Sequence, residues 1–231
     1  MPSSPNYLLA SLSARDFDFI EPHLEPVKLI LRKSLEKPNR RIEAVYFPHS
    51  GFASVVAIQS AKKQVEVGLI GREGMSGLPI LLGDHRSPHA TYMQAAGEGQ
   101  CMRSIDLRKA LHESSSLRDS LLKYVQAFTV QATHTAVCNA QSRLDQRLAR
   151  WLLMADDRLS GNDMLPLTHE FLSIMLGVRR PGVTDALNAL QRQGLLTCVR
   201  GGVAVRDRKG MERYAGETYG IPEAEYRRLI G

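Results

Sequence analysis

The sequence L-P-L-T-H-E-F-L-S-I-M-L-G-V-R-R-P-G-V-T-D-A-L-N-A-L-Q-R-Q-G-L-L, residues 165–196, decides the fold of the C-terminal part of the chain. Apolar residues recur at helical spacing on both sides of Gly177, which predicts two short amphipathic helices. Thr168 suits the N-cap of the first helix, because its hydroxyl can accept a hydrogen bond from an otherwise unpaired backbone N–H. Gly177 can adopt the left-handed conformation that ends this helix. The stretch therefore predicts a helix-turn-helix.

Two arginines stand at the start of the second helix. Pro181 is tolerated only in the first turn of a helix, so this helix must begin near Arg179 or Arg180. Both guanidinium groups then lie at its N-terminal tip, where a helix-turn-helix presents side chains to the edges of DNA bases. The same pattern also occurs in helix pairs that are only packing units, so the pattern alone leaves both possibilities open.

Two β-rich runs follow directly, at residues 195–199 and 203–205, and R-G-G at 200–202 separates them. Such runs around a Gly-Gly turn predict a β-hairpin. A helix-turn-helix followed at once by a hairpin is a winged helix. The whole segment therefore predicts a DNA-binding domain.

The overall composition is that of an ordinary globular protein with a mild basic excess. Of the 231 residues, 43% are hydrophobic and 23% are charged, and the net charge of +6 favours polyanionic partners without requiring them. No apolar run approaches the roughly 20 residues of a membrane span, and no secretory signal follows Met1. Cys101, Cys138 and Cys198 are too few and too scattered for a disulfide framework, a zinc site or an iron–sulfur cluster. We expect a cytoplasmic protein without a cofactor, a metal or membrane contact.

Short β-like segments dominate the N-terminal half, after one or two short helices within residues 7–24. Glycine and proline punctuate these segments, which predicts an antiparallel sandwich or barrel. The expected fold class is α+β, with an N-terminal antiparallel β-barrel, a long helix and a C-terminal winged helix. The expected strands lie near residues 27–32, 44–47, 53–58, 64–70, 91–96 and 101–105.

A long helix is expected after the barrel. Apolar residues repeat every three or four positions from about Ser116 to Cys138, without an internal Gly or Pro. A helix of about 30 Å is longer than a barrel of this size needs as a cover, so we expect it to pair with a second subunit. The alternative is that the helix packs wholly on its own barrel. The expected dimerisation residues are Leu117, Leu121, Tyr124, Phe128 and Thr135.

Polar residues 139–142 predict a hinge before a further helix over residues 143–159. The tail beyond Met211 has a helical segment near residues 224–229, in which the sequence reveals no chemistry. The expected domains are an effector or sensor β-barrel over residues 1–112, a dimerisation helix with its hinge over residues 113–140, and a winged-helix DNA-binding domain over residues 141–231.

This order of elements resembles that of the Crp–Fnr family of bacterial transcription regulators. The motifs that carry the resemblance are A-V-Y-F-P-H-S-G from Ala44, V-E-V-G-L-I-G-R-E-G-M from Val65 and L-G-V-R-R-P-G-V-T from Leu176. The resemblance covers about residues 7–210 and implies a cyclic-nucleotide-binding-type jelly-roll barrel, a dimerisation helix and a winged helix-turn-helix. It also implies a homodimer on a pseudo-palindromic operator in double-stranded DNA, with recognition helices about 34–36 Å apart. We further expect RNA polymerase as a partner.

The resemblance also indicates where a small-molecule effector would bind. Cyclic-AMP-binding members of the family carry a Gly-Glu-Leu cradle for the ribose and an Arg-Ser pair for the phosphate. This chain has Gly74, Met75 and Ser76 at the cradle, without an acid after the glycine, and the pair Arg86 and Ser87 before the next strand. These five residues are the candidate ligand-binding residues, and any effector is expected to differ from cyclic AMP.

In this family the recognition helix contacts bases through an Arg, the Glu after it and an Arg four residues further. Only the first carries over, as Arg180, whereas Pro181 and Asp185 take the other two positions. Arg180 can bind guanine O6 and N7 together, which is worth about 1–3 kcal/mol of discrimination. Asp185 can accept from cytosine N4 or tether a neighbouring arginine. The expected DNA-binding residues are Thr168, His169, Arg179, Arg180, Pro181, Thr184, Asp185, Asn188 and Arg200.

Two other classes of protein compete with a transcription regulator. A small-molecule-binding or scaffold module would use the helix-turn-helix only for packing. A cupin-like metalloenzyme needs a His-x-His pair with a downstream Glu and a third His, and the pair His85 and His89 lacks this spacing. No nucleophilic triad, paired acids or phosphate-binding glycine loop is present, so we expect no enzymatic activity.

Overall fold

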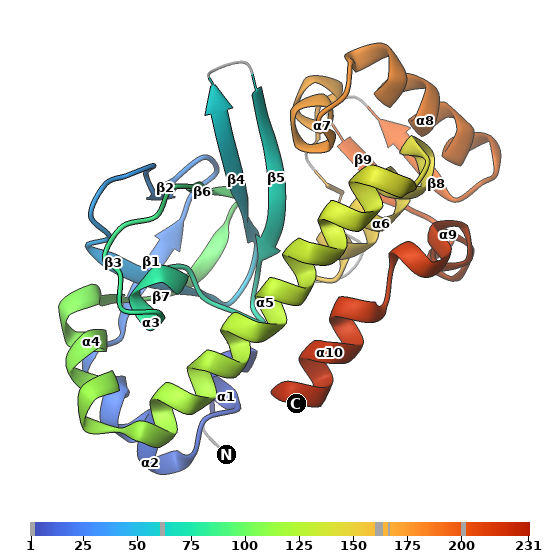
Figure 1. Cartoon of the computed structure of the whole chain (residues 1–231). Helices are drawn as coiled ribbons and strands as arrows, with labels where there is room; N and C mark the ends of the chain where they lie inside the picture. The colour runs from blue at the N-terminus through green and yellow to red at the C-terminus, as the bar shows by residue number, and fades with distance from the viewer. Residues whose placement is uncertain (1–2, 61–62, 160–163, 166, 200–201) are drawn as a thin grey trace.

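The computed structural model describes residues 3–60, 63–159, 164–165, 167–199 and 202–231. A β-sandwich forms the N-terminal half, and helices with one hairpin form the C-terminal half (Figure 1). The long helix α5 (Ser115–Gln141) runs along both halves, and the last helix, α10 (Ile221–Leu229), returns beside it. The expected α+β architecture is confirmed.

The sandwich consists of two antiparallel sheets, with strand orders β1-β7-β3 and β2-β6-β4-β5. Val45 and Phe47 alternate with less buried neighbours and point into the core, as the two-residue period of a strand requires. The expected strands are present with shifted ends, and β2 is an additional strand that is too short for a period to be visible. The strands are β1 (Glu25–Leu29), β2 (Ser34–Glu36), β3 (Ala44–Pro48), β4 (Phe52–Ser60), β5 (Lys63–Ile70), β6 (Ala90–Ala95) and β7 (Gly97–Arg103).

Short helices precede and follow the strands of the sandwich, and one more lies between β5 and β6. Asn6 and Ser13 cap the first two, because their side-chain oxygens accept hydrogen bonds from backbone amides three residues later, at 3.0 and 3.1 Å. Leu8, Leu9 and Ile20 bury their side chains completely in the sandwich core. The helices are α1 (Tyr7–Ala10), α2 (Ala14–Ile20), η1 (Glu21–His23), α3 (Leu78–Leu81) and α4 (Ser104–Glu113).

Helix α5 has 27 residues and is about 40 Å long. It begins after Ser114, whose hydroxyl accepts from the Leu117 amide at 3.2 Å. It packs against β5, α3 and α4 of the sandwich and against α10. The helix continues through residues 139–141, so the expected hinge is limited to the extended residue Ser142.

The C-terminal half has its own apolar core, which continues into the sandwich. Leu148, Leu187 and Leu190 are among its fully buried members. Trp151 makes edge-on contacts with Phe52 of β4 and Phe171, with ring centroids 6.2 and 5.8 Å apart. The elements are α6 (Leu144–Asp156), α7 (His169–Leu176), α8 (Arg180–Arg192), β8 (Leu196–Val199), β9 (Gly202–Val205), α9 (Arg208–Ala215) and η2 (Gly216–Thr218), followed by α10.

Candidate functional site

The helix-turn-helix has the geometry that its local sequence dictates. The Thr168 hydroxyl accepts a hydrogen bond from the Phe171 amide at 3.1 Å, which caps α7. Gly177 has a φ of 64°, a left-handed conformation that a residue with a Cβ adopts only with strain. Helix α8 then begins at Arg180, with Pro181 in its first turn and Arg179 as the N-cap.

One face of α8 is buried and the other is open to solvent. Val183, Leu187 and Leu190 fix the helix in the core. The solvent side carries five of the expected DNA-binding residues, and a sixth is exposed at the α7 cap. These exposed residues are Arg179, Arg180, Pro181, Asp185 and Asn188, together with Thr168.

The two arginines at the tip of α8 carry a concentrated positive charge. Among the described residues, neither Arg179 nor Arg180 forms an ion pair, and Asp185 does not tether either of them. Both guanidinium groups keep their hydrogen-bond donors available for a phosphate or a base edge. This arrangement can bind a polyanion.

Two of the expected DNA-binding residues, His169 and Thr184, contact each other, so their polar groups already have a partner within the protein. His169 Nδ1 lies 2.9 Å from the Thr184 hydroxyl, which also lies 3.3 Å from the Arg180 carbonyl oxygen. Both side chains are half-buried, and this pair joins the start of α7 to the first turn of α8. The pair therefore fixes the angle between the two helices.

The predicted wing is present. Strands β8 and β9 pair antiparallel, with Leu196 opposite Val205 and Val199 opposite Gly202. Leu165 extends this small sheet through a bridge to Val203. Arg200, the expected phosphate-contacting residue of the wing, lies outside the described residues.

The expected dimerisation stripe of α5 faces its own chain, which corrects that part of the sequence interpretation. Leu117, Leu121 and Tyr124 are buried in the core beneath the sandwich. Phe128 is half-buried against β5, where a Cβ on Gly68 would come within 2.8 Å of its ring. Leu117, Leu121 and Tyr124 are therefore covered by their own protomer, whereas Phe128 keeps part of its surface exposed.

The fifth expected dimerisation residue, Thr135, also contacts its own chain. Its hydroxyl donates to the Gln131 carbonyl oxygen at 2.9 Å and lies 3.1 Å from Nη2 of Arg150, which donates to it. Thr135 therefore connects α5 to α6. The alternative of packing on the same chain accounts for Leu117, Leu121 and Tyr124, whereas Phe128 and Thr135 contact their own chain and remain partly exposed.

The expected effector cradle is also filled by the protein itself. Met75 and Ser76 are completely buried, and Ser76 exchanges hydrogen bonds with the backbone of Tyr46 at 2.9 and 3.1 Å. A Cβ on Gly74 would lie 2.1 Å from the hydroxyl oxygen of Tyr124. Because no space remains beside these three residues, the structure does not support them as a ligand site.

The two residues of the candidate phosphate-binding pair, Arg86 and Ser87, lie in different environments. Arg86 is exposed, whereas Ser87 is buried beside Glu36. The Glu36 carboxylate accepts a hydrogen bond from the Gly77 amide at 2.7 Å. Burial raises the pKa of Glu36, and hydrogen bonds from Gly77, Ser87 and Thr91 oppose this effect. An internal carboxylate thus takes the hydrogen bonds that an anionic ligand would need here.

A second group of polar residues, which the sequence did not reveal, joins the sandwich to α6. Glu66 of β5 is buried, and its Oε1 accepts a hydrogen bond from the Trp151 indole at 2.6 Å. Its Oε2 and the Ser54 hydroxyl have no hydrogen-bond partner among the described residues. Burial raises the pKa of Glu66 to about 7, although Trp151 and the Arg150 guanidinium oppose the shift.

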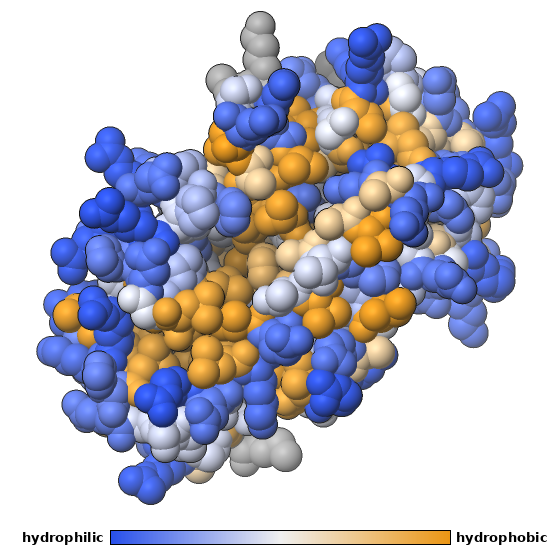
Figure 2. Space-filling model, in the orientation of Figure 1, coloured by the Kyte–Doolittle hydropathy of each residue, from blue (hydrophilic) through white to orange (hydrophobic). Residues whose placement is uncertain are grey.

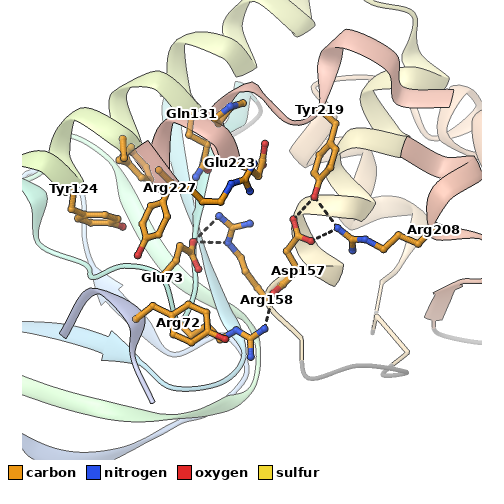
Figure 3. A pocket seen from close by; sticks show the side chains of 15 residues that line it. Arg72, Glu73, Tyr124, Gln131, Asp157, Arg158, Arg208, Tyr219, Glu223 and Arg227 are labelled. Atoms are coloured by element: carbon orange, nitrogen blue, oxygen red, sulfur yellow. Dashed lines mark hydrogen bonds and ion pairs between the residues drawn. The ribbon is translucent and has the colours of Figure 1, made fainter. Parts of the chain in front are cut away.

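A buried ion pair lies at the same boundary. Arg158, just after α6, places Nε 2.8 Å and Nη2 2.6 Å from Oε1 of Glu73, which follows β5 (Figure 3). Nη1 of Arg158 also donates to the Met154 carbonyl oxygen at 2.6 Å. These partners are 85 positions apart in the chain, so sequence spacing gives no sign of them.

In the part of the chain that the structure describes, no three His, Cys, Asp or Glu side chains are grouped so that they could hold a metal ion. None of the described helices combines the length and the apolar character that a membrane crossing requires.

Comparisons with known proteins agree with this geometry. Residues 146–214 match the model of the Crp-like helix-turn-helix domain. The fold is similar to that of FixK2 from Bradyrhizobium japonicum, which is 16% identical with a TM-score of 0.69 over 84% of this chain and 98% of the other. A CRP/FNR-family transcriptional regulator from Thermus thermophilus is 21% identical, with a TM-score of 0.66 over 83% and 98% of the two chains.

The c-di-GMP-responsive global regulator CLP from Xanthomonas campestris is similar in the same way. It is 17% identical, with a TM-score of 0.65 over 84% of this chain and 100% of the other. No curated protein sequence matches the chain. The chain therefore shares the fold of these solved structures. That fold is of the Crp/Fnr type, and its C-terminal part is a Crp-like helix-turn-helix domain, as the sequence motifs indicated.

Proposed function

We propose that the protein is a homodimeric, sequence-specific transcription regulator that reads double-stranded DNA with α8. The observation that carries this proposal is the exposed tip of α8, where Arg179 and Arg180 have no ion-pair partner among the described residues. Helix α8 enters the major groove, and Arg180 pairs with a guanine. Pro181 and Asp185 stand at the other base-reading positions and give an operator that differs from the family's best-known half-site.

The remaining expected contacts serve mainly to position the protein on DNA. Thr168 lies at the α7 cap, where exposed backbone amides and a hydroxyl suit a phosphate. Asn188 lies on the exposed side of α8, and Arg200 of the wing would contact the backbone. Such phosphate contacts raise the affinity for every sequence alike and make it depend on salt.

The dimer forms through the outer stripe of α5, which we define as Leu122, Thr129, Thr133, Ala136 and Val137. This stripe lies on the side of α5 opposite the buried Gln131, and its last four residues are exposed. The hydroxyls of Thr129 and Thr133 donate to their own helix at the i−4 carbonyls, at 2.8 and 2.9 Å, so their methyl groups face outward.

Figure 2 shows the corresponding band of pale and orange residues along α5, bordered by blue hydrophilic residues. Pairing of two such bands would bury apolar surface and place two α8 helices on neighbouring major grooves. The proposed domains are an effector or sensor β-sandwich over residues 1–112, a dimerisation helix over residues 113–140 and a DNA-binding domain over residues 141–231. RNA polymerase is the proposed further partner, and the cytoplasm is the proposed location.

Selection of bound sequences from random duplex DNA tests the proposal. We expect a pseudo-palindromic site, and Arg180→Ala should relax the preference at one base pair of each half-site by about 1–3 kcal/mol. Arg192→Ala is the matched control, because Arg192 is exposed at the far end of the same helix. A wild-type protein that enriches no sequence, or an Arg180→Ala variant with unchanged preference, contradicts the assignment.

A further inference from the structure

A cavity of about 370 Å³ opens between the β-sandwich, α5 and the C-terminal helices. We call it the junction pocket and define it by Arg72, Tyr124, Tyr219, Tyr226 and Arg227, which line it (Figure 3). Its walls come from the start of α1, the loop after β5, α5, the turn after α6, the start of α9, the segment after η2, and α10. The volume is within the range of small-molecule sites. The pocket borders the filled cradle at Gly74–Ser76 through Tyr124, and none of its lining residues belongs to α8.

The lining of the junction pocket is aromatic. Four tyrosines and Phe128 contribute to it, which is a high share of the seven tyrosines and six phenylalanines in the chain. The hydroxyls of Tyr124 and Tyr219 are bonded to Met75 O and Asp157, at 3.3 and 2.7 Å. The Tyr226 hydroxyl is buried without a hydrogen-bond partner among the described residues. Such a lining suits a planar ring that also offers a hydrogen-bonding group.

The charges of the pocket leave two guanidinium groups available. Four arginines and three carboxylates line it, but Arg158 is paired with Glu73, and Arg208 with two aspartates. Arg72 makes one hydrogen bond, of 3.4 Å to the Asp157 carbonyl oxygen, and lies over the Tyr7 ring at 4.9 Å.

The second available guanidinium belongs to α10. Arg227 is exposed and has no ion pair among the described residues. The third carboxylate, that of Glu223, accepts a hydrogen bond from the Gly220 amide at 3.0 Å. The net charge of the lining side chains is therefore positive, and the guanidinium groups that are available to a ligand belong to Arg72 and Arg227. Guanidinium groups of this kind bind a carboxylate or a phosphate through paired hydrogen bonds.

We propose that the junction pocket binds a small aromatic anion, a planar ring that bears a carboxylate or a phosphate, and that this ligand regulates the protein. The ring packs against Tyr124, Phe128 and Tyr226, and the anion pairs with Arg72 and Arg227. The ligand thereby contacts the sandwich, the long helix and the C-terminal half at once. Any difference in its affinity between two domain arrangements shifts the balance between them. This regulatory part rests on the proposed function, whereas the binding does not.

Calorimetric titration of the full chain tests the binding. The probes are phenyl phosphate and benzoate as simple aromatic anions, adenosine monophosphate as a nucleotide, and inorganic phosphate and benzamide as controls that lack the ring or the charge. At least one aromatic anion should bind with a Kd below about 1 mM, and both controls should bind more weakly. Stronger binding of the nucleotide identifies a nucleotide effector, and stronger binding of the simple anions identifies an aromatic acid or phosphate ester. The absence of saturable binding by all three aromatic anions overturns the proposal.

Variants locate the bound probe. Arg227→Met should weaken binding at least about tenfold, because a charge-assisted pair is lost. Arg228→Met is the matched control, since Arg228 is exposed, pairs with Glu225 at 2.6 Å and does not line the pocket. Arg86→Met should also leave the affinity unchanged. A loss caused by Arg86→Met, with Arg227→Met unaffected, places the ligand in the sandwich and overturns the proposal.

Tyr226→Phe is the second test, because it removes only the buried hydroxyl that lacks a partner. The free protein should melt at the same or a higher temperature, whereas the probe should bind about fivefold more weakly. Unchanged affinity in both this variant and Arg227→Met overturns the site.

DNA binding is then measured with and without the probe that binds. A change of at least about fivefold in the affinity for DNA supports regulation, and an unchanged affinity overturns the regulatory part. If the protein binds no DNA while Arg227→Met still abolishes binding of the probe, the proposed function fails and the ligand site stands.

Discussion

Replacing Glu66 by glutamine is expected to stabilise the protein at neutral and higher pH. The carboxyl is completely buried between β5 and α6, and one oxygen accepts from the Trp151 indole at 2.6 Å. Glutamine has almost the same shape and retains this acceptor. Its amide group can donate to the Ser54 hydroxyl, which has no partner among the described residues. The substitution therefore removes a buried negative charge and leaves the packing intact.

The magnitude follows from the pKa of Glu66, which burial raises from 4.5 to about 7. The folded state holds the proton more tightly than the unfolded state, so the free energy of unfolding falls as the pH rises from about 4.5 to about 7. The full difference corresponds to about 3 kcal/mol at about pH 8, and to less than about 1 kcal/mol at about pH 5. Glu66→Gln should recover most of this free energy at the higher pH.

Urea unfolding at the two pH values measures the effect. Far-UV circular dichroism follows the backbone, and the fluorescence of Trp151, the single tryptophan, reports on the boundary itself. Glu98→Gln is the matched control, because this side chain is exposed on a strand of the same sandwich. A Glu66→Gln variant that is less stable than the wild type at about pH 8, or equally affected at both pH values, refutes the reasoning.

Three further substitutions test the caps, the core and the dimer. Thr168→Ala removes the acceptor of the Phe171 amide and should lower the free energy of urea unfolding by about 1 kcal/mol. Gly74→Ala places a Cβ 2.1 Å from the Tyr124 hydroxyl oxygen and should cost about 1–3 kcal/mol in the same assay, a prediction that an unchanged midpoint would contradict. Val137→Glu puts a charge in the outer stripe of α5, so light scattering should find single chains where the wild type forms dimers, with helix content unchanged.

The sequence predicted the winged helix well because its chemistry is local. A hydroxyl at Thr168, a left-handed glycine at position 177 and a proline at position 181 each fix one helix end through atoms a few residues away. The hairpin after α8 has the same local character, and its two strands pair as expected. Local interactions of this kind do not depend on the tertiary arrangement, so they can be predicted from one sequence alone.

The dimerisation stripe could not be assigned in this way. Helical periodicity shows which face of α5 is apolar, but the same stripe is expected whether the face covers its own sandwich or a second subunit. In this chain the stripe of Leu117 and Leu121 covers the sandwich. The outer stripe contains two threonines, which count as polar in a sequence pattern. Only the structure shows that the hydroxyls of Thr129 and Thr133 are bonded to their own helix.

The boundary between the two halves was invisible in the sequence, and its chemistry explains why it can respond to signals. Apolar contacts such as Trp151 against Phe52 hold the halves together at any pH, whereas the Glu66 carboxyl beside the same indole changes charge near neutrality. A buried charge without a partner is costly. A change in the charge of Glu66, or the arrival of an anion nearby, therefore changes the free energy with which the two halves dock more than a change at an exposed contact would. The junction pocket opens beside the pair of Glu73 and Arg158, within this boundary. Neutralising Glu66 and filling the junction pocket should therefore act on one docking equilibrium, and their effects on DNA affinity should not be additive.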